Sequence, residues 1–468
     1  MLTRIELDGF KSFEGFAVDL SPHTVVLGPN GVGKSNLFDA IHFLSALANG
    51  SVADAAREMR GQPHELFSFG PDGRPRGDMK LAVEVLLPTG LRDSWGNEVD
   101  VEHPRLRYEV AIERRLKDGV ESLAIVSERA TSIYAKEDRW RPYGRPPSKP
   151  FTRQIIRRQT RSRRDTPFLN TVEHDEDKQL GPAFALHHDG KAGRIRYLPA
   201  TGADATVLST ISTAEFKHLF ALREEFRSWR FFQLDPVSIR DSARGSWSQQ
   251  LEPDGRNLGR VLNRIRMQTR SDTNPEGVLP DIATDLADLV DGVRALRVEA
   301  DEQIRDFRIR LEMADRVIYS SQLISDGTLR LLALLTLFND PDFSGLLCME
   351  EPENGVHPER LMTLLRLMRD RVTDPEDEDP DPNEPLQQIL TNSHSPVVLS
   401  AVQGRDQEAL FADMVIRTDP ATGGRVKRTR LRPIRSHSSQ GRLLNGEAPP
   451  YVTSFEVERF LKTVKTGS

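Results

Sequence analysis

The chain has 468 residues, which is enough for two or three domains or for one large elaborated domain. Its 64 Lys and Arg residues against 70 Asp and Glu residues give a net charge of −6, which excludes a global basic excess for nucleic-acid binding and leaves only local basic surfaces. The single cysteine, Cys348, excludes a disulfide framework, and no apolar stretch reaches the roughly 18 residues that span a bilayer. We therefore expect a soluble, cytoplasmic protein that makes no membrane contact.

The chain opens with two expected strands and a phosphate-binding turn. Residues 2–8 and 16–20 alternate apolar and polar, and residues 23–44 pass from a β-branched run through a glycine-rich turn into a helical pattern. The turn, GPNGVGKS, matches G-x-x-x-x-G-K-[ST], in which backbone N–H groups and the helix N-terminus bind phosphate, the lysine reaches the outer phosphates and the serine is placed for Mg²⁺. The sequence predicts an ATP and Mg²⁺ site formed by Gly28, Asn30, Gly31, Gly33, Lys34, Ser35 and Asn36.

An antiparallel β-meander is expected at 79–130, followed by a basic segment. Residues 139–164 are rich in Lys and Arg, contain no acid and include Trp140, Tyr143 and Phe151. Such a run is usually a solvated insertion; the alternative is a surface that follows phosphates and offers aromatic stacking points. The nucleic-acid candidates under that alternative are Arg153, Arg157, Arg158, Arg161, Arg163 and Arg164.

The middle of the chain is expected to be largely helical. A strand is predicted within 229–240, and apolar residues then fall at helical spacing to about residue 296, while residues 296–313 fit either a helix or strands. No apolar heptad is sustained, so a long coiled coil is not expected. Ser325 and Gly327 precede an apolar helix, where they form an ordinary N-cap or, alternatively, a phosphate contact at the helix start.

Two adjacent carboxylates follow the apolar run at 346–349. Glu350 and Glu351 stand directly before Pro352, and like charges at a buried strand tip are costly unless a cation or solvent compensates them. A P-loop site needs one acid to hold Mg²⁺ through water and another to orient or deprotonate the attacking water. We assign the first role to Glu350 and the second to Glu351; the plain alternative is that these acids begin a surface turn.

A histidine follows the next expected strand. His394 comes after the strand predicted at 387–392, where an imidazole can contact the γ-phosphate or the attacking water. The predicted catalytic residues are thus Glu351, His394 and Lys34. Between the carboxylates and this strand, residues 373–385 are acidic and proline-rich and predict an exposed loop. Residues 410–434 predict a strand hairpin that completes the sheet.

The order GPNGVGKS, SDGTLR, apolar-Glu-Glu and histidine resembles ABC-type ATPase heads, and the details resemble the SMC/RecF-like subgroup. The first hairpin, LTRIELDGFKSFEGFAVDL, is similar to that of SMC-like heads, EPDGRNLGRVL to a RecF-like segment, and EEPENGVHPERL to a stretch of the defence-associated OLD-like group. The resemblance implies an α/β ABC-type head with a mixed P-loop sheet, an antiparallel β-subdomain and a helical signature lobe. The expected divisions are 1–240, with a basic insertion at about 131–196, then 241–345 and 346–468.

The resemblance also implies further site residues. Two heads of this family dimerise head-to-tail, so that Ser325 and Gly327 contact the γ-phosphate bound at Lys34 of the other subunit, and Asn354 and His357 lie at the dimer interface in the D-loop. Gln233 is the candidate for the glutamine that joins the two lobes at the metal, with Gln154 and Gln159 as competitors.

The leading functional hypothesis is an ATPase whose dimerisation gates a partner effector in defence against phage or foreign DNA. The resemblance implies a homodimer or higher even oligomer and, since no fused Toprim nuclease is expected in this chain, a separately encoded nuclease or Toprim-like partner. The alternatives are a RecF-like DNA repair ATPase that binds DNA directly and a nucleotide-gated scaffold with little turnover.

Overall fold

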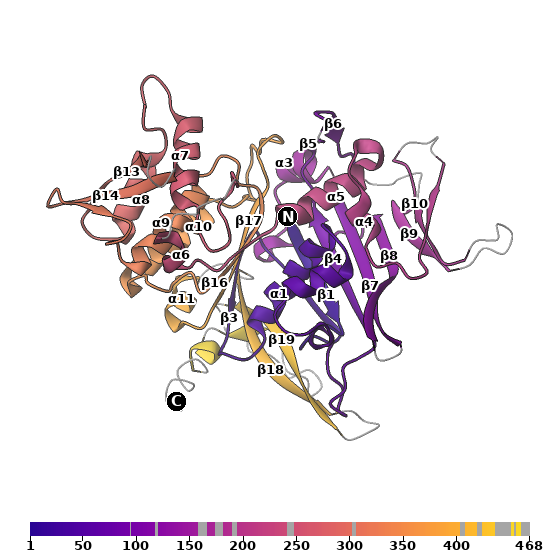
Figure 1. The fold of residues 1–468 in the computed structure, drawn as a ribbon. Coiled ribbons are helices and arrows are strands. Elements are labelled where there is room, and N and C mark those ends of the chain that lie inside the picture. The colour runs from indigo at the N-terminus through magenta and orange to yellow at the C-terminus, as the bar shows by residue number, and fades with distance from the viewer. Residues whose placement is uncertain are drawn as a thin grey trace.

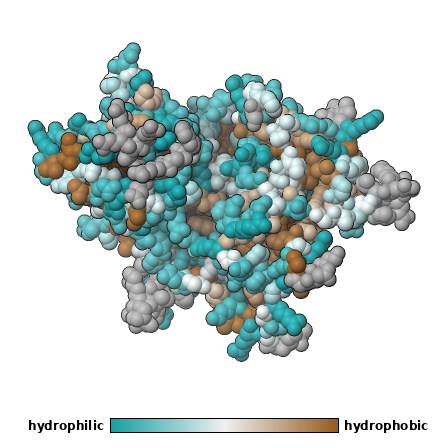
Figure 2. Space-filling view, in the orientation of Figure 1, coloured by the Kyte–Doolittle hydropathy of each residue, from teal (hydrophilic) through white to brown (hydrophobic). Residues whose placement is uncertain are grey.

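The fold consists of two packed parts that share a central sheet (Figure 1). This computed structural model describes all residues except 94, 118–119, 158–165, 174–180, 190–193, 241–247, 302–305, 403–407, 419–423, 436–450, 454 and 460–468. Hydrophilic residues dominate the visible surface, with hydrophobic residues in separate patches (Figure 2). Within the described residues, no helix is both long enough and apolar enough to cross a membrane.

The first part is built on an eight-stranded antiparallel sheet in the order β11-β10-β9-β8-β7-β4-β1-β2, on the right in Figure 1. Its strands are β1 (Leu2–Asp8), β2 (Phe16–Asp19), β4 (Asp78–Leu86), β7 (Arg105–Lys117), β8 (Val120–Ser132), β9 (Leu169–Val172), β10 (Ala183–Leu186) and β11 (Arg196–Pro199). A small hairpin of β5 (Gly90–Arg92) and β6 (Glu98–Asp100) lies between β4 and β7 in the chain. The two N-terminal strands and the meander predicted at 79–130 are confirmed.

The second sheet carries the phosphate-binding turn. Its seven strands lie in the order β12-β16-β17-β3-β18-β19-β20, and β12 through β18 are parallel to their neighbours. They are β12 (Arg230–Phe232), β16 (Gly345–Glu350), β17 (Gln387–Ser393), β3 (His23–Leu27), β18 (Ala409–Thr418), β19 (Arg425–Arg435) and β20 (Val452–Thr453). The predicted terminal hairpin is the antiparallel pair β18–β19. Since parallel strands end at one edge, the residues after β3, β12, β16 and β17 meet there.

One apolar core joins both sheets through α1 (Lys34–Leu47). It contains Leu37 and Ile41 of α1, Ile5 of β1, and Leu346 and Cys348 of β16. The helices α2 (Val52–Glu58), α4 (Val207–Thr210) and α5 (Lys217–Ser228) also contribute to this core. Cys348 is buried, as expected for a small hydrophobic residue.

A second core covers the opposite face of the parallel sheet. Leu347 and Met349 of β16 point into it, because side chains alternate along a strand. Its helices are α7 (Leu258–Thr269), α8 (Leu279–Leu289), α9 (Asp326–Phe338), α10 (Leu361–Arg369) and α11 (Pro396–Ala401), with α6 (Pro236–Arg240) packed against α9. Both faces of β16 are therefore buried, which explains its continuous apolar sequence.

This helical lobe also contains a three-stranded antiparallel sheet of β13 (Val293–Asp301), β14 (Asp306–Met313) and β15 (Ile318–Ser320). The ambiguous residues 296–313 are thus strands. Leu296 and Val298 on β13, and Ile309 and Leu311 on β14, point into the core while their neighbours point outward, which is the two-residue period of a strand.

Short helical turns complete the described structure: η1 (Pro63–Leu66), η2 (Pro142–Gly144), α3 (Lys149–Phe151), η3 (Thr152–Ile156), η5 (Ala214–Phe216) and η6 (Pro358–Arg360). The strand predicted within 229–240 is only Arg230–Phe232, because Pro236 begins α6. The acidic residues 373–385 form the predicted exposed loop before β17.

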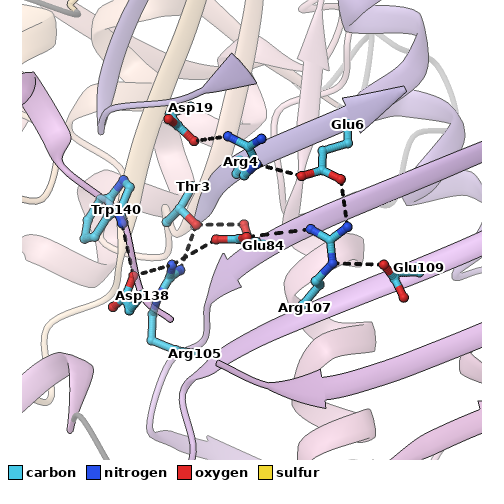
Figure 3. A network of polar contacts seen from close by, with 10 residues as sticks. All are labelled: Thr3, Arg4, Glu6, Asp19, Glu84, Arg105, Arg107, Glu109, Asp138 and Trp140. Carbon is cyan, nitrogen blue, oxygen red and sulfur yellow. Dashed lines mark hydrogen bonds and ion pairs between the residues drawn. The ribbon is translucent and has the colours of Figure 1, made fainter. Parts of the chain in front are cut away.

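A network of ion pairs ties the first sheet to the residues after β8 (Figure 3). Arg107 of β7 pairs at 2.7 Å with Glu6 of β1, across the intervening strand β4, and at 2.9 Å with Glu109, two residues further along its own strand. Arg105 is buried and pairs with Asp138 at 3.0 Å, and the backbone N–H of Trp140 donates to the same carboxylate at 3.1 Å. Buried charges are tolerated when they are paired and hydrogen-bonded, so this network fixes the start of the basic segment against the sheet.

The aromatic residues of the basic segment are not stacking points. Trp140, Tyr143 and Phe151 are 3%, 9% and 1% exposed. Trp140 and Phe151 pack in a small third core with Ile155 and Ile156. The alternative in which these aromatic side chains are exposed stacking points is wrong, because their burial anchors the proline-rich segment to the sheet.

Candidate functional site

The phosphate-binding turn connects β3 to α1 and has the expected backbone. Gly31 and Gly33 have φ of 78° and 95°, in the left-handed region that glycine adopts without strain. At Gly33 a side chain is also excluded by space, since a Cβ there would lie 2.1 Å from the Thr429 Oγ1 atom. A Cβ at Gly31 would meet nothing within 4 Å, so that glycine borders open space.

Lys34 begins α1 and folds back over the turn. Its Nζ donates to the carbonyl oxygens of Gly28 at 2.7 Å and Pro29 at 2.8 Å. Burial lowers the pKa of Lys34, while the charges of Glu351, Glu353 and Glu350 oppose that shift. The ammonium therefore lies among the turn's own carbonyls and close to the carboxylates at the end of β16.

Glu350 is the last residue of β16, and Glu351 leaves the strand with φ of 48°. The backbone N–H of Glu351 donates to the Asn392 carbonyl oxygen at 3.1 Å, which fixes the turn to the neighbouring strand β17. A positive φ is uncommon outside glycine, and such conformations gather at functional sites because the surrounding contacts must hold them. In this conformation the charge of Glu351 interacts with that of the P-loop lysine, Lys34.

The Glu351 carboxylate is held by two side chains. Its Oε1 is 2.7 Å from Nδ1 of His394, and its Oε2 accepts from Nδ2 of Asn354 at 2.9 Å. Burial opposes ionisation, but the hydrogen bonds from Asn354 and His394 and the charges of His394 and Lys34 outweigh it, so the pKa of Glu351 lies below its ordinary value. The carboxylate is ionised and oriented, as an acceptor of a proton from water requires.

Glu353 is a residue of this site that the sequence motif did not single out. It accepts a hydrogen bond from the Ser393 hydroxyl, and its Oε2 is buried without a partner among the described residues. Burial raises the pKa of Glu353, and the charge of Glu351 adds to the shift. Glu353 follows Pro352 in the EEPE stretch. Its inward orientation is evident only from the contact with Ser393 at the end of β17.

A second unexpected group joins α1 and α2 to the acidic strand tip. Arg60 lies within 3.0 Å of Asp39 and 3.2 Å of Glu350, and the Lys11 ammonium is 2.6 Å from the other oxygen of Asp39. The sequence carried no signal for this contact, because Arg60 follows a short helix with ordinary surface residues. A cation already faces Glu350, the position where a metal was predicted.

The turn is braced by two residues that lie 417 positions apart in the sequence, Ser12 and Thr429. Thr429 on β19 donates its hydroxyl to the Val32 carbonyl at 2.8 Å, and its Oγ1 lies 2.6 Å from the Ser12 hydroxyl. Asn36 of α1 donates its amide to the same Ser12 hydroxyl at 2.9 Å. The phosphate-binding turn is thus clamped by Ser12 and Thr429.

Two cavities open beside the carboxylates. One of about 200 Å³ is lined by Gln233, Arg330, Glu350, Glu351 and Asn354, among others, and the other, of about 580 Å³, by Arg60, Gln233 and Glu350 and the outer side of α1. Gln233 directly follows β12, which is parallel to β16, so both side chains lie at the same sheet edge. Its competitor Gln154 lies in η3 beside the third core, and Gln159 lies outside the described residues.

Ser325 is the N-cap of α9, with its Oγ accepting from the Thr328 N–H at 3.2 Å. Gly327 lies against Gly355 of the same chain, since a Cβ at Gly327 would stand 2.5 Å from the Gly355 carbonyl oxygen. Contact within a single subunit is therefore enough to explain why a glycine is needed at position 327. Asn354 and His357 lie in the same exposed turn after β16, and His357 is 3.8 Å from Glu359.

The residues present fit Mg²⁺ bound together with a nucleotide. Within the described ranges there is no cluster of three His, Cys, Asp or Glu side chains that could hold a metal by itself. Mg²⁺ is commonly held by one or two protein groups with substrate phosphates and waters, and Ser35 and Glu350 offer that donor set around the turn. The open space over Gly31 leaves room for phosphate beside these groups.

Comparison with known proteins gives two family matches and several partial relatives. A model described as "AAA domain, putative AbiEii toxin, Type IV TA system" matches residues 213–400, and one described as "AAA domain" matches residues 4–173. The DNA replication and repair protein RecF of Mesorhizobium japonicum is 30% identical over 131 residues, covering 27% of this chain and 31% of that protein. The chromosome partition protein Smc of Bacillus subtilis is 36% identical over 129 residues, covering 27% of this chain and 10% of that protein.

The two AAA-domain matches and the partial similarity to RecF and Smc proteins support an SMC/RecF-like ABC-type ATPase. The aligned parts span less than a third of either relative's length. Among solved structures, an SmcHead bound to the C-winged helix domain of ScpA gives a TM-score of 0.46 at 15% identity, covering 92% of this chain and 97% of that one. The Smc head domain with a coiled coil and joint from Pyrococcus yayanosii gives 0.45 at 12% identity, covering 99% of each chain.

In this SMC/RecF-like chain, the residues predicted for one site come from distant parts of the sequence and do meet. The P-loop, Glu350, Glu351, His394 and Gln233 share the carboxyl edge of the parallel sheet. Ser325 and Gly327 lie at the start of α9, against the turn after β16. The basic candidates lie elsewhere: Arg153 is exposed on η3, Arg157 pairs with Asp100 at 3.3 Å, and Arg158, Arg161, Arg163 and Arg164 fall outside the described residues.

Proposed function

We propose that the chain binds ATP with Mg²⁺ at the P-loop and hydrolyses the γ-phosphate. This proposal rests on the Glu351 carboxylate. His394 and Asn354 hold it by hydrogen bonds, and its charge interacts with that of Lys34. Glu351 accepts the proton of the attacking water, His394 positions that carboxylate, and Lys34 binds the phosphates. Ser35 and Glu350 would hold Mg²⁺, with Gln233 as a further candidate, and the ion would neutralise phosphate charge.

Glu351→Gln tests this assignment. The variant keeps the shape of the side chain and loses the base, so phosphate release should fall by about 10²-fold or more while ATP affinity is retained. Lys34→Ala should lose ATP binding itself, measured with a fluorescent ATP analogue. The control is Glu359→Gln, which removes an exposed carboxylate of the same loop and should hydrolyse like the wild type. Wild-type turnover in Glu351→Gln would refute the role of Glu351.

We further propose that ATP joins two copies head-to-tail, with Ser325 and Gly327 contacting the γ-phosphate on the partner and Asn354 and His357 at the interface. Support comes from the exposed turn at Asn354 and His357, which packs beside the start of α9. The divisions 1–240, 241–345 and 346–468 belong to the same proposal, with the second lobe presenting the signature residues.

The biological role we favour is the gating of a separate effector in defence against phage or foreign DNA. The model matching residues 213–400 carries a description that names a putative toxin of a type IV toxin–antitoxin system, which supports this choice. Cells that carry this gene with its neighbouring genes should resist phage, and Lys34→Ala should remove that resistance. Resistance that persists in Lys34→Ala would contradict ATP-dependent gating.

Direct action on DNA is the second candidate, favoured by the relatives named as RecF and Smc. It predicts ATP hydrolysis that is stimulated by DNA, and hydrolysis unaffected by DNA would count against it. A nucleotide-gated scaffold would instead show full biological activity in Glu351→Gln and no measurable turnover in the wild type.

A further inference from the structure

Two oppositely charged segments, far apart in the chain, lie against each other. The basic segment, here residues 139–157, contacts the acidic loop, residues 373–385. The backbone N–H of Ser148 donates to the Pro375 carbonyl at 2.8 Å, and the Ser148 hydroxyl donates to the Asp377 carbonyl at 2.5 Å. The Arg145 guanidinium lies 3.7 Å from the Glu376 carboxylate.

The basic segment is folded and firmly attached. Trp140, Phe151 and Ile155 pack with Leu386, the residue that follows the acidic loop and precedes β17. The Trp140 indole N–H donates to the Leu20 carbonyl at 2.9 Å, and Arg105 lies 5.7 Å from the ring centroid (Figure 3). The acidic loop is therefore held to the basic segment near both of its ends.

The charges of the basic segment point to solvent. Its exposed cations are Arg139, Arg141, Arg145, Lys149 and Arg153. Within the part of the chain that the structure describes, Arg145 alone among these five forms an ion pair with an acid. Five exposed cations on one short, rigid segment form a surface that attracts phosphate groups.

The acidic loop displays its charges in an ordered way. Its acids are exposed, namely Asp374, Glu376, Asp377, Glu378, Asp379, Asp381 and Glu384. Asp374, Asp377 and Asp381 each accept a backbone N–H two residues ahead, at 2.9 to 3.0 Å, which fixes the loop as a series of tight turns. The loop is thus a fixed polyanion next to the cations.

We propose that the basic segment binds the phosphate backbone of nucleic acid and that the acidic loop competes for it from within the same chain. Charges closer than about 10 Å interact strongly at about 0.1 M salt, so the docked loop weakens the attraction of phosphate to the segment. Nucleic acid binds the exposed cations against the repulsion of the loop's carboxylates and replaces Glu376 beside Arg145. The acidic loop then regulates how strongly the basic segment of the same chain binds phosphate groups.

This surface does not depend on the proposed ATPase function. The Tyr143 hydroxyl accepts from the N–H of His23 at 2.9 Å, at the first residue of β3, whereas the P-loop follows the last residue of that strand. A strand of five residues spans roughly 17 Å. In Figure 1, α3 lies at the upper end of the parallel sheet and α11, after His394, at the lower end. Binding can therefore be measured without nucleotide.

The test neutralises the loop while keeping its turns. Glu376→Gln, Asp377→Asn, Glu378→Gln and Asp379→Asn are combined in the full chain, and affinity for a labelled mixed-sequence DNA duplex is measured by fluorescence anisotropy without ATP. We expect about tenfold tighter binding at about 0.1 M salt and a steeper loss of affinity with added salt, because each neutralised phosphate contributes about −0.9 to the logarithmic slope.

A matched control removes the same number of charges from the other lobe, with Asp272→Asn, Glu276→Gln, Asp288→Asn and Asp315→Asn. It should bind DNA like the wild type. Adding Arg145→Glu, Lys149→Glu and Arg153→Glu to the neutralised loop should abolish the gain, with thermal unfolding as a check on folding. Equal affinity in the loop variant and the control, or a gain that survives the three reversals, would overturn the proposal.

Discussion

At the scale of single residues, the proposed hydrolysis depends on the pair Glu351 and His394. The left-handed backbone at Glu351 and the short connection after β17 bring a carboxylate and an imidazole to 2.7 Å. The Glu351 side chain is 31% exposed and that of His394 41%, so water can reach both. In the proposed hydrolysis, His394 therefore acts through the Glu351 carboxylate, as a positioning residue.

His394→Ala should therefore slow hydrolysis by about tenfold, less than the loss in Glu351→Gln, because the carboxylate remains but is less well oriented. Phosphate release under single turnover measures the rate, and ATP affinity should stay at its wild-type value. His394→Gln, which can still donate to Glu351, should recover part of the rate. A loss as large as that of Glu351→Gln would give His394 a direct part in the reaction.

Site residues that belong to a local sequence motif could be predicted from the sequence. Site residues that are brought together only by the fold could not. GPNGVGKS, the paired glutamates and His394 follow strands that are recognisable by their apolar runs, so their meeting at one sheet edge was predictable. Neither Arg60 nor Thr429 belongs to a motif or follows a recognisable apolar strand. Each lies in a segment with ordinary polar neighbours, and only the packing of α2 and β19 around the P-loop brings them to Glu350 and Gly33.

At the scale of elements, a buried carboxylate joins the antiparallel sheet to a helix. Glu128 of β8 accepts from the N–H groups of Val207 at 2.6 Å and Leu208 at 3.1 Å, at the start of α4, and from the Tyr108 hydroxyl at 2.9 Å. Burial raises the pKa of Glu128 to about 7, although these hydrogen bonds lower it. Glu128, the residue that attaches α4 to β8, is therefore partly protonated near neutral pH.

Stability should depend on pH through this residue. The unfolded chain has an ordinary carboxyl pKa of 4.5 and the folded chain a pKa of about 7, so the folded state binds the extra proton between these values. Its free energy of unfolding should fall as pH rises from about 4.5 to 7, by about 3 kcal/mol at most, and then level off. Urea midpoints at several pH values measure this.

Glu128→Gln is the matched variant, because the amide oxygen still accepts from Val207 and carries no charge. Its stability should vary less across that pH range than the wild type's, with the two curves approaching each other on the acid side. Parallel curves would show that another group carries the dependence.

At the scale of the whole molecule, the exposed start of α9 is where a second copy is expected. Ser325→Arg should leave ATP binding by the monomer intact and prevent the ATP-bound dimer, since a large cation then stands where the partner's phosphate would lie. Light scattering with and without ATP measures the mass. Ser325→Ala is the control: it loses the same N-cap at a cost of about 1 kcal/mol but adds no bulk, so it should still dimerise.

A dimer that forms normally in Ser325→Arg would show that the start of α9 does not lie in the interface.

The contact between the acidic loop and the basic segment is the second feature at the scale of the whole molecule. The sequence predicted each as an exposed charged run, and their contact was not predictable, because more than 200 residues and several elements separate Ser148 from Pro375.

The clamp on the P-loop has a consequence for how the protein is made. The turn at residues 28–35 is synthesised before β19, and the hydroxyl that holds its Val32 carbonyl belongs to Thr429, which is added 397 residues later. A ribosome-bound chain thus exposes the whole phosphate-binding sequence long before its brace exists. We therefore expect the proposed ATP binding to become firm only when β19 has been made and has reached its place beside the turn.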